Sequence, residues 1–181
     1  MAIRKLTDGV RGWNSKMPFP KDRYTLRCIE ESFSPSKSSG NPMITREWEI
    51  CAPELVVIGD KEVDIDGLKV QQYVVIDNIK DAEKGNKAFG RFSDELTVLG
   101  FDDEEGIDTE KPPLVAKGKV VDAIVYGKED VSRKTPTKEQ LKKGIKQGDP
   151  IKGPDGKDIK TYQLTIESIL GLSTVEVNRP Y

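Results

Sequence analysis

The chain has 181 residues, of which 35% are hydrophobic and 33% are charged, and its formal net charge is −2. No stretch approaches the roughly 20 apolar residues of a transmembrane helix, and the amino terminus lacks the apolar region of a secretory signal, so we expect a cytoplasmic protein with no membrane partner. Histidine is absent, which excludes Ser-His-Asp and Cys-His catalysis.

The small net charge hides a strong segregation of charge along the chain. Residues 1–50 carry 9 Lys/Arg against 6 Asp/Glu, residues 51–110 carry 6 against 16, and residues 111–181 carry 14 against 9. This distribution allows a basic surface on a mildly acidic protein. Cys28 and Cys51 belong to no C-x-x-C unit, so we expect two buried, reduced thiols, no zinc site and no other cofactor.

The first 22 residues are expected to form an N-terminal arm. They show no hydrophobic periodicity, and glycine and proline recur among them. Trp13 and Phe19 indicate that part of this arm packs against the rest of the chain. Trp13 lies among small and basic residues in the stretch RGWNSK, so it could equally stack on a nucleic-acid base, and both alternatives stay open.

Two β-strands are predicted next, over residues 23–33 and 44–50. In the first, the alternation of apolar residues changes parity after Cys28, and such a slip indicates a β-bulge. In the second, Trp48 shares its parity with two isoleucines, which favours a core position. The loop between the strands, residues 34–42, is rich in Ser, Lys, Gly and Asn.

Residues 55–77 are predicted to form a β-hairpin, because the pair Asp66-Gly67 is typical of a tight two-residue turn. A helix is predicted over residues 89–99. Four apolar residues recur there at spacings of three and four, and Gly100 is placed to end the helix.

A long strand is predicted over residues 114–127, in which Gly118 indicates a bend or a close backbone approach. Residues 128–160 form a basic insertion with 10 Lys/Arg against 6 Asp/Glu. Within it, the stretch TPTKEQLKKGIKQG indicates a short helix. The last predicted strand is YQLTIESIL, at 162–170, and a short tail follows.

The predicted order of elements is three strands, a helix, a strand, an insertion and a final strand. It matches a mainly β, OB-fold-like five-stranded Greek-key barrel, with one helix between strands 3 and 4 and a long, partly helical insertion between strands 4 and 5. We therefore expect an N-terminal arm at 1–22, an OB-fold domain at 23–172 that includes the basic insertion 128–160, and a tail at 173–181. In the OB-fold, strands 2 and 3 and the loops 1–2 and 4–5 bind oligonucleotides, and both loops carry basic residues here.

The stretch FPKDRYTLRCIEESFSPSKSSGNPMITREWEI, together with the later helix ending LTVLG, resembles single-stranded-DNA-binding proteins of tailed phages. The resemblance covers residues 19–101 and extends to the rest of the chain by topology. It implies an OB-fold protein that coats single-stranded DNA (ssDNA) during phage DNA replication and recombination, alongside phage or host proteins of those processes. The tail STVEVNRPY departs from the acidic, Phe-terminated tails of many replicative ssDNA-binding proteins. Self-association into a homo-oligomer stays open.

Sequence-independent binding of ssDNA requires cations along the backbone path and exposed rings on which any base can stack. Tyr73 lies opposite Val74 in strand parity and is the better stacking candidate, whereas Trp48 is favoured as a core residue. The expected nucleic-acid-binding residues are Trp13, Arg27, Lys37, Arg46, Trp48, Tyr73, Lys117, Lys119, Lys134, Lys138, Lys142 and Lys143.

Two other functions remain as alternatives. The first is a protein–protein adaptor, in which the acidic middle of the chain docks a basic partner. The second is a metal-dependent nuclease that uses the acidic run Asp102–Glu105. Four adjacent acids in one loop cannot all converge on a metal pair, and no other catalytic motif is present, so we expect neither an enzyme nor a metal site.

Overall fold

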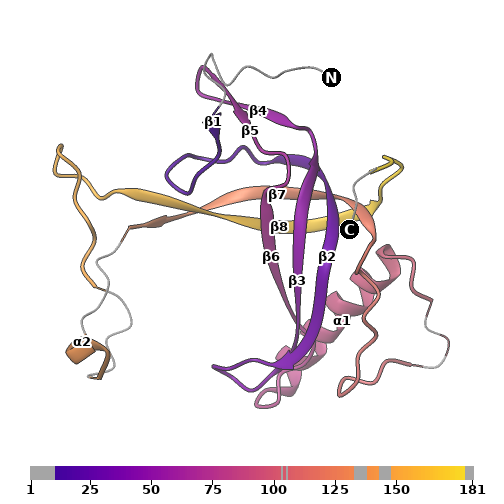
Figure 1. Ribbon diagram of the computed structural model, residues 1–181. Helices are drawn as coiled ribbons and strands as arrows, with labels where there is room; N and C mark the ends of the chain where they lie inside the picture. The colour runs from indigo at the N-terminus through magenta and orange to yellow at the C-terminus, as the bar shows by residue number, and fades with distance from the viewer. Residues whose placement is uncertain (1–10, 103, 105, 133–137, 143–147, 178–181) are drawn as a thin grey trace.

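The structure is a computed structural model that describes residues 11–102, 104, 106–132, 138–142 and 148–177 (Figure 1). As the sequence predicts, the described part of the chain is mainly β; its strands form a five-stranded and a three-stranded sheet. None of the described helices is long and apolar enough to cross a membrane.

The main sheet is antiparallel and has the strand order β6-β3-β2-β7-β8. Its edge strands, β6 and β8, lie near each other but share no hydrogen-bonded ladder in the described residues. The sheet is therefore curved without closing into a barrel (Figure 1). Its strands are β2, Asp22–Pro35; β3, Pro42–Ala52; β6, Lys69–Val75; β7, Val120–Val131; and β8, Lys160–Leu172.

Strand β2 bends at two irregularities in its pairing with β3. The register shifts between Thr25 and Leu26, and again between Cys28 and Glu30. The second shift lies where the sequence predicts a change of parity, since Cys28 is buried before it and Glu31 after it. An extra residue on one strand bends that strand and increases its twist, so the predicted bulge is confirmed.

The chain turns at Asp66-Gly67 as predicted, where the Leu68 amide donates to the Ile65 carbonyl at 3.2 Å, but the strands on the two sides of this turn do not pair as the predicted hairpin. Strand β5, Lys61–Asp64, pairs instead with β4, Leu55–Ile58, through a turn at residues 59–60. The Gly67 amide donates to the Ile50 carbonyl at 2.9 Å, which returns the chain to the main sheet. Gly59 and Gly67 both have positive φ angles, so both turns form, and the local turn residues do not determine which of them joins two paired strands. Within β5, only Val63 has a buried side chain, which belongs to the main core.

A small sheet of order β1-β5-β4 covers one end of the main sheet (Figure 1). Its first strand, β1, Arg11–Gly12, pairs in parallel with β5. The chain then packs on the main core, where the Trp13 ring meets Phe19 edge to face at 5.7 Å. The described part of the predicted N-terminal arm therefore belongs to the folded body.

Helix α1, Ala82–Val98, covers the other end of the main sheet and follows β6 in the sequence (Figure 1). Phe92 and Leu96 of the helix are buried against Ile44 of β3 and Ile76, which follows β6. These four residues form a cluster separate from the main core. Gly100, at a φ of 77°, follows the helix end. The helix and its terminating glycine are thus confirmed, although the helix begins at Ala82 and not at residue 89 as predicted.

Strand β7 begins at Val120, later than predicted, because the chain turns at residues 117–118. Gly118 has a φ of 82°, and its amide donates to the Cys28 carbonyl at 2.8 Å, which is the close approach that the sequence indicates. Beyond the main sheet, β7 and β8 continue as a two-stranded projection that carries α2, Lys138–Lys142 (Figure 1). We call residues 128–160 the basic arm.

Candidate nucleic-acid interface

The side chains of β2, β3 and β6 that point away from the core form one continuous surface. Strand alternation and register place them in three rows. Buried residues with the opposite parity, such as Ile44 and Val70, define the inward direction. We call this surface the outer face; its rows are Ser34, Met43 and Val75; Ser32, Thr45 and Tyr73; and Glu30, Glu47 and Gln71.

Tyr73 lies in the middle row of the outer face with its side chain in solvent. It is 59% exposed, and Val75 beside it on the same strand face is 39% exposed. Its cross-strand neighbour is Thr45. None of the side chains in the first two rows of the outer face carries a charge. The ring is therefore accessible from solvent, as stacking on a base requires.

The loop between β2 and β3 lies at the uncharged end of the outer face. It closes on itself through hydrogen bonds from the Ser36 amide to the Asn41 carbonyl and from the Gly40 amide to the Ser36 carbonyl, both at 2.8 Å. The Asn41 side chain is buried and accepts from the Ile79 amide at 3.1 Å, which ties the loop to the segment after β6. Lys37 is exposed within this loop.

Arg46 does not reach the surface, which corrects its expected role as a surface cation. Its side chain is fully buried, its Nε donates to Glu31 Oε1 at 2.7 Å, and its Nη1 bonds to Glu95 of α1. Burial alone would lower the pKa of Arg46, but the nearby Glu95 and Glu31 carboxylates raise it above its ordinary value. Because Arg46 shares the inward parity of Ile44 and Trp48, it enters the core and requires these carboxylates as partners.

Trp48 is also fully buried, as its parity favours, so it offers no stacking surface. Its Nε1 donates to Gln72 Oε1 at 3.0 Å, and Gln72 Nε2 donates to Glu95 Oε2 at 2.9 Å. A polar network therefore runs from the sheet to α1 beneath the outer face.

Arg27 is the second cation that the structure places below the surface. It is 7% exposed, and its Nη2 lies 2.5 Å from Glu49 Oε1 on the paired strand. Its expected role as an exposed phosphate-binding residue is corrected for the same reason, since its charge is neutralised within the sheet.

Lys117 and Lys119 fall at the same parity within the strand predicted over residues 114–127, which would place them on one face, but both precede β7. Lys117 is exposed and pairs with Glu30 at 3.1 Å. Lys119 is half-buried, and its Nζ donates to the Leu99 carbonyl at the end of α1. That contact places a cation at the negative end of a helix. The Lys119 ammonium group therefore stabilises the end of α1.

Trp13 packs into the body with its indole engaged. Its Nε1 donates to the Met17 carbonyl at 3.0 Å, and the ring packs against Phe19 and the main core. Of the two alternatives for Trp13, docking is the one that the structure shows.

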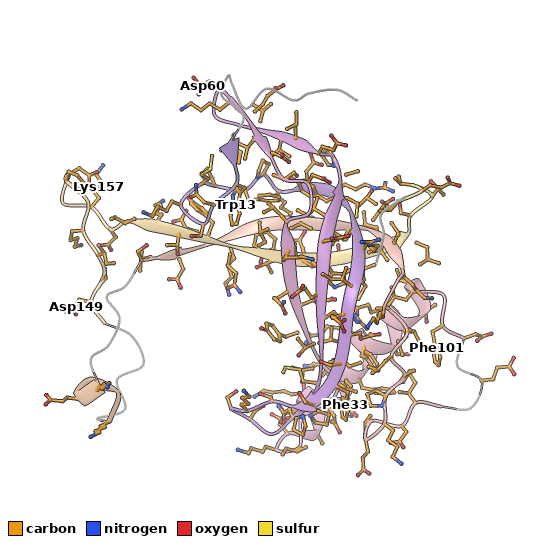
Figure 2. The ribbon with its side chains drawn as sticks, in the orientation of Figure 1. Trp13, Phe33, Asp60, Phe101, Asp149 and Lys157 are labelled. Atoms are coloured by element: carbon orange, nitrogen blue, oxygen red, sulfur yellow. The ribbon has the colours of Figure 1, made fainter. Side chains whose placement is uncertain are left out.

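The remaining expected cations lie on the basic arm. Lys138 and Lys142 are exposed on α2, whereas Lys134 and Lys143 lie outside the described residues. Figure 1 shows α2 at the end of the projection, on the side of the sheet where β6 forms the edge. Figure 2 shows the arm residues Asp149 and Lys157 to one side of the body that holds Trp13, Phe33 and Phe101.

The surroundings of Tyr73 are the part of this site that sequence reasoning missed. Met43, Thr45 and Val75 flank the ring in the outer face, yet none was singled out. Their outward parity could have been found from the buried positions of the same strands. The pairing of β3 with β6, which brings Met43 and Thr45 next to Val75 and Tyr73, could not have been found from the alternation within each strand.

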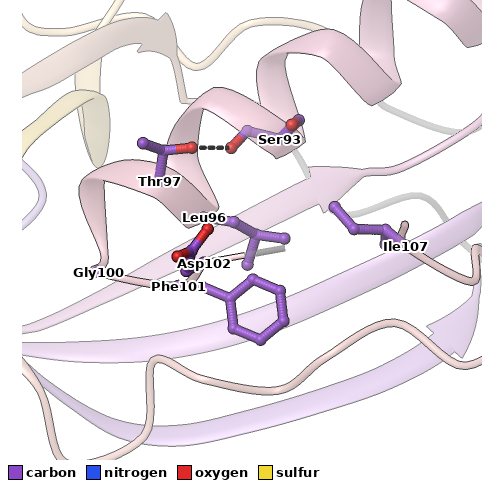
Figure 3. Close-up of a pocket in the computed structure, with 7 residues that line it drawn as sticks. All are labelled: Ser93, Leu96, Thr97, Gly100, Phe101, Asp102 and Ile107. Carbon is purple, nitrogen blue, oxygen red and sulfur yellow. Dashed lines mark hydrogen bonds between the residues drawn. The ribbon is translucent and has the colours of Figure 1, made fainter. Parts of the chain in front are cut away.

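A hollow of about 440 Å³ lies beside α1 and is separate from the outer face (Figure 3). Leu96, Phe101 and Ile107 supply its apolar lining, and among the described residues Asp102 is its one ionisable lining residue. The Thr97 hydroxyl at its rim donates to the Ser93 carbonyl at 3.1 Å. The described lining residues thus include no pair of ionisable side chains.

No group of three or more Cys, Asp or Glu side chains gathers into a metal-binding arrangement among the described residues. Asp103 and Glu105, two of the four acids in the run considered for a nuclease, lie outside them. The nuclease alternative therefore stays a prediction without a test.

Comparisons of this chain with protein-family models, with curated proteins and with solved structures found no match. A functional conclusion therefore depends on the residues and the geometry of the chain itself.

Proposed function

We propose that this protein binds single-stranded DNA independently of sequence, through the outer face, the Lys37 loop and the basic arm. The observation that carries the proposal is the exposed Tyr73 ring, which lies on an uncharged part of the outer face beside a loop that carries a lysine. A flat ring next to cations is the combination that ssDNA binding requires.

The strand arrangement supports this proposal. Strands β2, β3 and β6 follow one another across the sheet, and β7 returns through α1 to lie beside β2. This spatial order is that of a Greek key, as expected for an OB-fold. On that assignment, β3 and β6 are the second and third strands, and the Lys37 loop and the basic arm are the 1–2 and 4–5 loops.

Charge within the outer face suggests the path of the bound strand. Its third row contains Glu30 and Glu47, whose carboxylates repel phosphates, although Lys117 and Lys69 lie near them. The first two rows contain no carboxylate. We therefore expect the bases to stack over Tyr73 and the phosphates to pass at the loop end of the face.

In the cell, the resemblance to tailed-phage proteins extends the proposal to the coating of ssDNA during phage replication and recombination. Binding would protect the strand by covering its bases and would need no catalysis.

Replacement of Tyr73 tests the stacking element. Because each stacked base contributes roughly 1–3 kcal/mol, we expect Tyr73→Ala to weaken binding to oligo-dT by about 5- to 150-fold. Tyr73→Phe keeps the ring and should bind like the wild type. Fluorescence anisotropy of labelled oligo-dT at fixed low salt measures both. Equal affinity of the wild type and Tyr73→Ala would contradict the stacking role.

The electrostatic element is tested by reversing charges on the basic arm. Lys138→Glu with Lys142→Glu should weaken oligo-dT binding and lower its dependence on salt, because fewer counterions are released. Lys84→Glu with Lys87→Glu, at exposed positions of α1, makes the same change in net charge away from the site. If the wild type leaves oligo-dT unbound at low salt, the proposed function is wrong.

A further inference from the structure

The β4–β5 hairpin carries a surface that the proposed function does not use. Register places Leu55 opposite Asp64, and Val57 opposite Glu62. Their side chains point outward, because Val63, between the two acids, is buried in the core. We call these four residues, together with Asp60 in the turn that joins the two strands, the hairpin face.

The hairpin face combines uncovered apolar area with negative charge. Leu55 is 42% and Val57 is 63% exposed, and among the described residues β4 is an edge strand of the small sheet. Isolated exposed aliphatic residues need no explanation, but two on one face of an edge strand leave both apolar surface and backbone groups open to a partner.

The charge of the hairpin specifies the chemistry of that partner. Asp60 in the turn and Glu62 on β5 are exposed, and Figure 2 shows Asp60 at the extreme end of the molecule. Among the described residues, no cation forms an ion pair with either of them. A partner that fits this surface is therefore basic and also offers an apolar side chain.

The same chain contains such a surface on the basic arm. Lys138 and Lys142 are exposed there, and Ile151 is 36% exposed. Neither hydrophobic cluster includes a described residue of the arm beyond the strands β7 and β8. Figure 1 shows the hairpin at the top of the molecule and α2 at its lower left, so one molecule does not bring the two surfaces together.

We infer that the hairpin face of one molecule docks the basic arm of a second copy, and that ssDNA displaces this contact by taking the arm. The two surfaces differ, so the contact is heterologous and links copies head to tail. Complementary charge would give the pairing its orientation and its sensitivity to salt. The displacement by DNA depends on the proposed function, whereas the contact between copies does not.

The contact is tested without DNA by sedimentation velocity over a range of protein concentrations at low salt. We expect the wild type to associate reversibly and to dissociate as salt is added. Asp60→Lys with Glu62→Lys should abolish the association, and so should Lys138→Glu with Lys142→Glu. A chain with all four substitutions should associate again, because its charges are exchanged. Val57→Ser, which changes no charge, should weaken association.

Matched controls separate this contact from general charge effects. Glu104→Lys with Glu110→Lys, and Lys84→Glu with Lys87→Glu, make equal charge changes at exposed positions elsewhere and should leave association intact. A wild type that stays monomeric at every concentration, or a four-substitution chain that does not associate, overturns the inference. Capture of polylysine by a chain that does not self-associate would assign the hairpin to a foreign basic partner and overturn it as well.

Addition of oligo-dT distinguishes this inference from the proposed function. We expect stoichiometric oligo-dT to dissociate the wild-type assembly, while the Asp60→Lys, Glu62→Lys chain binds the same oligonucleotide at least as tightly as the wild type, because no second copy competes for its arm. Self-association without any DNA binding would reject the proposed function and leave the contact standing. DNA binding by a wild type that stays monomeric at every concentration would support the proposed function and reject the contact between copies.

Discussion

Arg46 is held in the core by charge compensation. Glu31 is as deeply buried as Arg46 itself, and its second oxygen accepts from the Ala116 amide at 2.8 Å. Glu95 joins the pair from α1. Each charge in this group is tolerable only because the others are present, since an unpaired charge in a protein interior is strongly destabilising.

Removal of the guanidinium alone should therefore be costly. We expect Arg46→Met to lower the free energy of unfolding by about 3–5 kcal/mol, because it leaves Glu31 charged and buried. Combining it with Glu31→Gln and Glu95→Gln should recover most of this loss. Urea denaturation measures each variant, and Arg91→Met, at an exposed arginine of α1, is the control. Equal stability of the Arg46 and Arg91 variants would contradict the role of the network.

Cys28 differs from an ordinary thiol because of its surroundings. Burial, with a smaller contribution from the Glu31 carboxylate, raises the pKa of the Cys28 thiol to about 12. Thiolate is the reactive form, so Cys28 should resist a disulfide reagent at pH 8 in the native protein and react in denaturant. Counting of released chromophore should give at most one fast thiol per native chain. Two fast thiols in the native state would contradict the burial of Cys28.

At the scale of elements, α1 shows that glycine has position-dependent roles within one helix. A side chain added at Gly85 would lie 2.3 Å from Asp77 Oδ1 and 3.2 Å from the Asn78 amide nitrogen. A side chain at Gly90 would meet nothing within 4 Å. Gly85 therefore permits the close approach of the helix to the turn after β6, whereas Gly90 only weakens the helix.

Alanine at these two positions should have opposite effects. Gly90→Ala should raise the free energy of unfolding by about 0.5–1 kcal/mol, because alanine favours the helix and restricts the unfolded chain. Gly85→Ala gains the same propensity but has to displace the Asp77 carboxylate from the Asn78 amide, so we expect a net loss of about 1 kcal/mol. Thermal unfolding of the two variants provides the comparison, and stabilisation by Gly85→Ala would refute the packing argument.

At the scale of the whole molecule, the body and the basic arm are separable. The main core lies between the curved sheet and the small sheet, and α1 adds a second cluster at the other end. The Ser132 amide donates to the Ile159 carbonyl at 2.7 Å, so the chain enters and leaves the outer part of the arm at neighbouring points. The hydrophobic core of the body therefore forms without the outer part of the arm.

Shortening the arm should therefore separate stability from binding. Replacement of residues 133–158 with a two-residue Asn-Gly turn should change the free energy of unfolding by less than about 1 kcal/mol, since a shorter loop costs less closure entropy. Affinity for oligo-dT should fall and should depend less on salt. Denaturation and anisotropy measured on the same preparation test both parts. Loss of folding, or unchanged DNA affinity, would contradict this division.

The sequence by itself determined the features that depend on near neighbours along the chain. Alternation located β2 and β3, the change of parity located the bulge near Cys28, and helical spacing located the second half of α1 and its end before Gly100. The same alternation placed Trp48 in the core and Tyr73 in solvent. These features could be predicted because strand and helix periods are local properties of the backbone.

The tertiary structure alone decided which residues meet across long separations. It paired β5 with β4 rather than β6, and it buried Arg46 against Glu95, 49 residues away. It also engaged Lys119 at the end of α1 and so removed an expected surface cation. The physical reason is that a charge can be buried wherever an opposite charge compensates it, and the position of that compensating charge is set by packing, which no local period encodes.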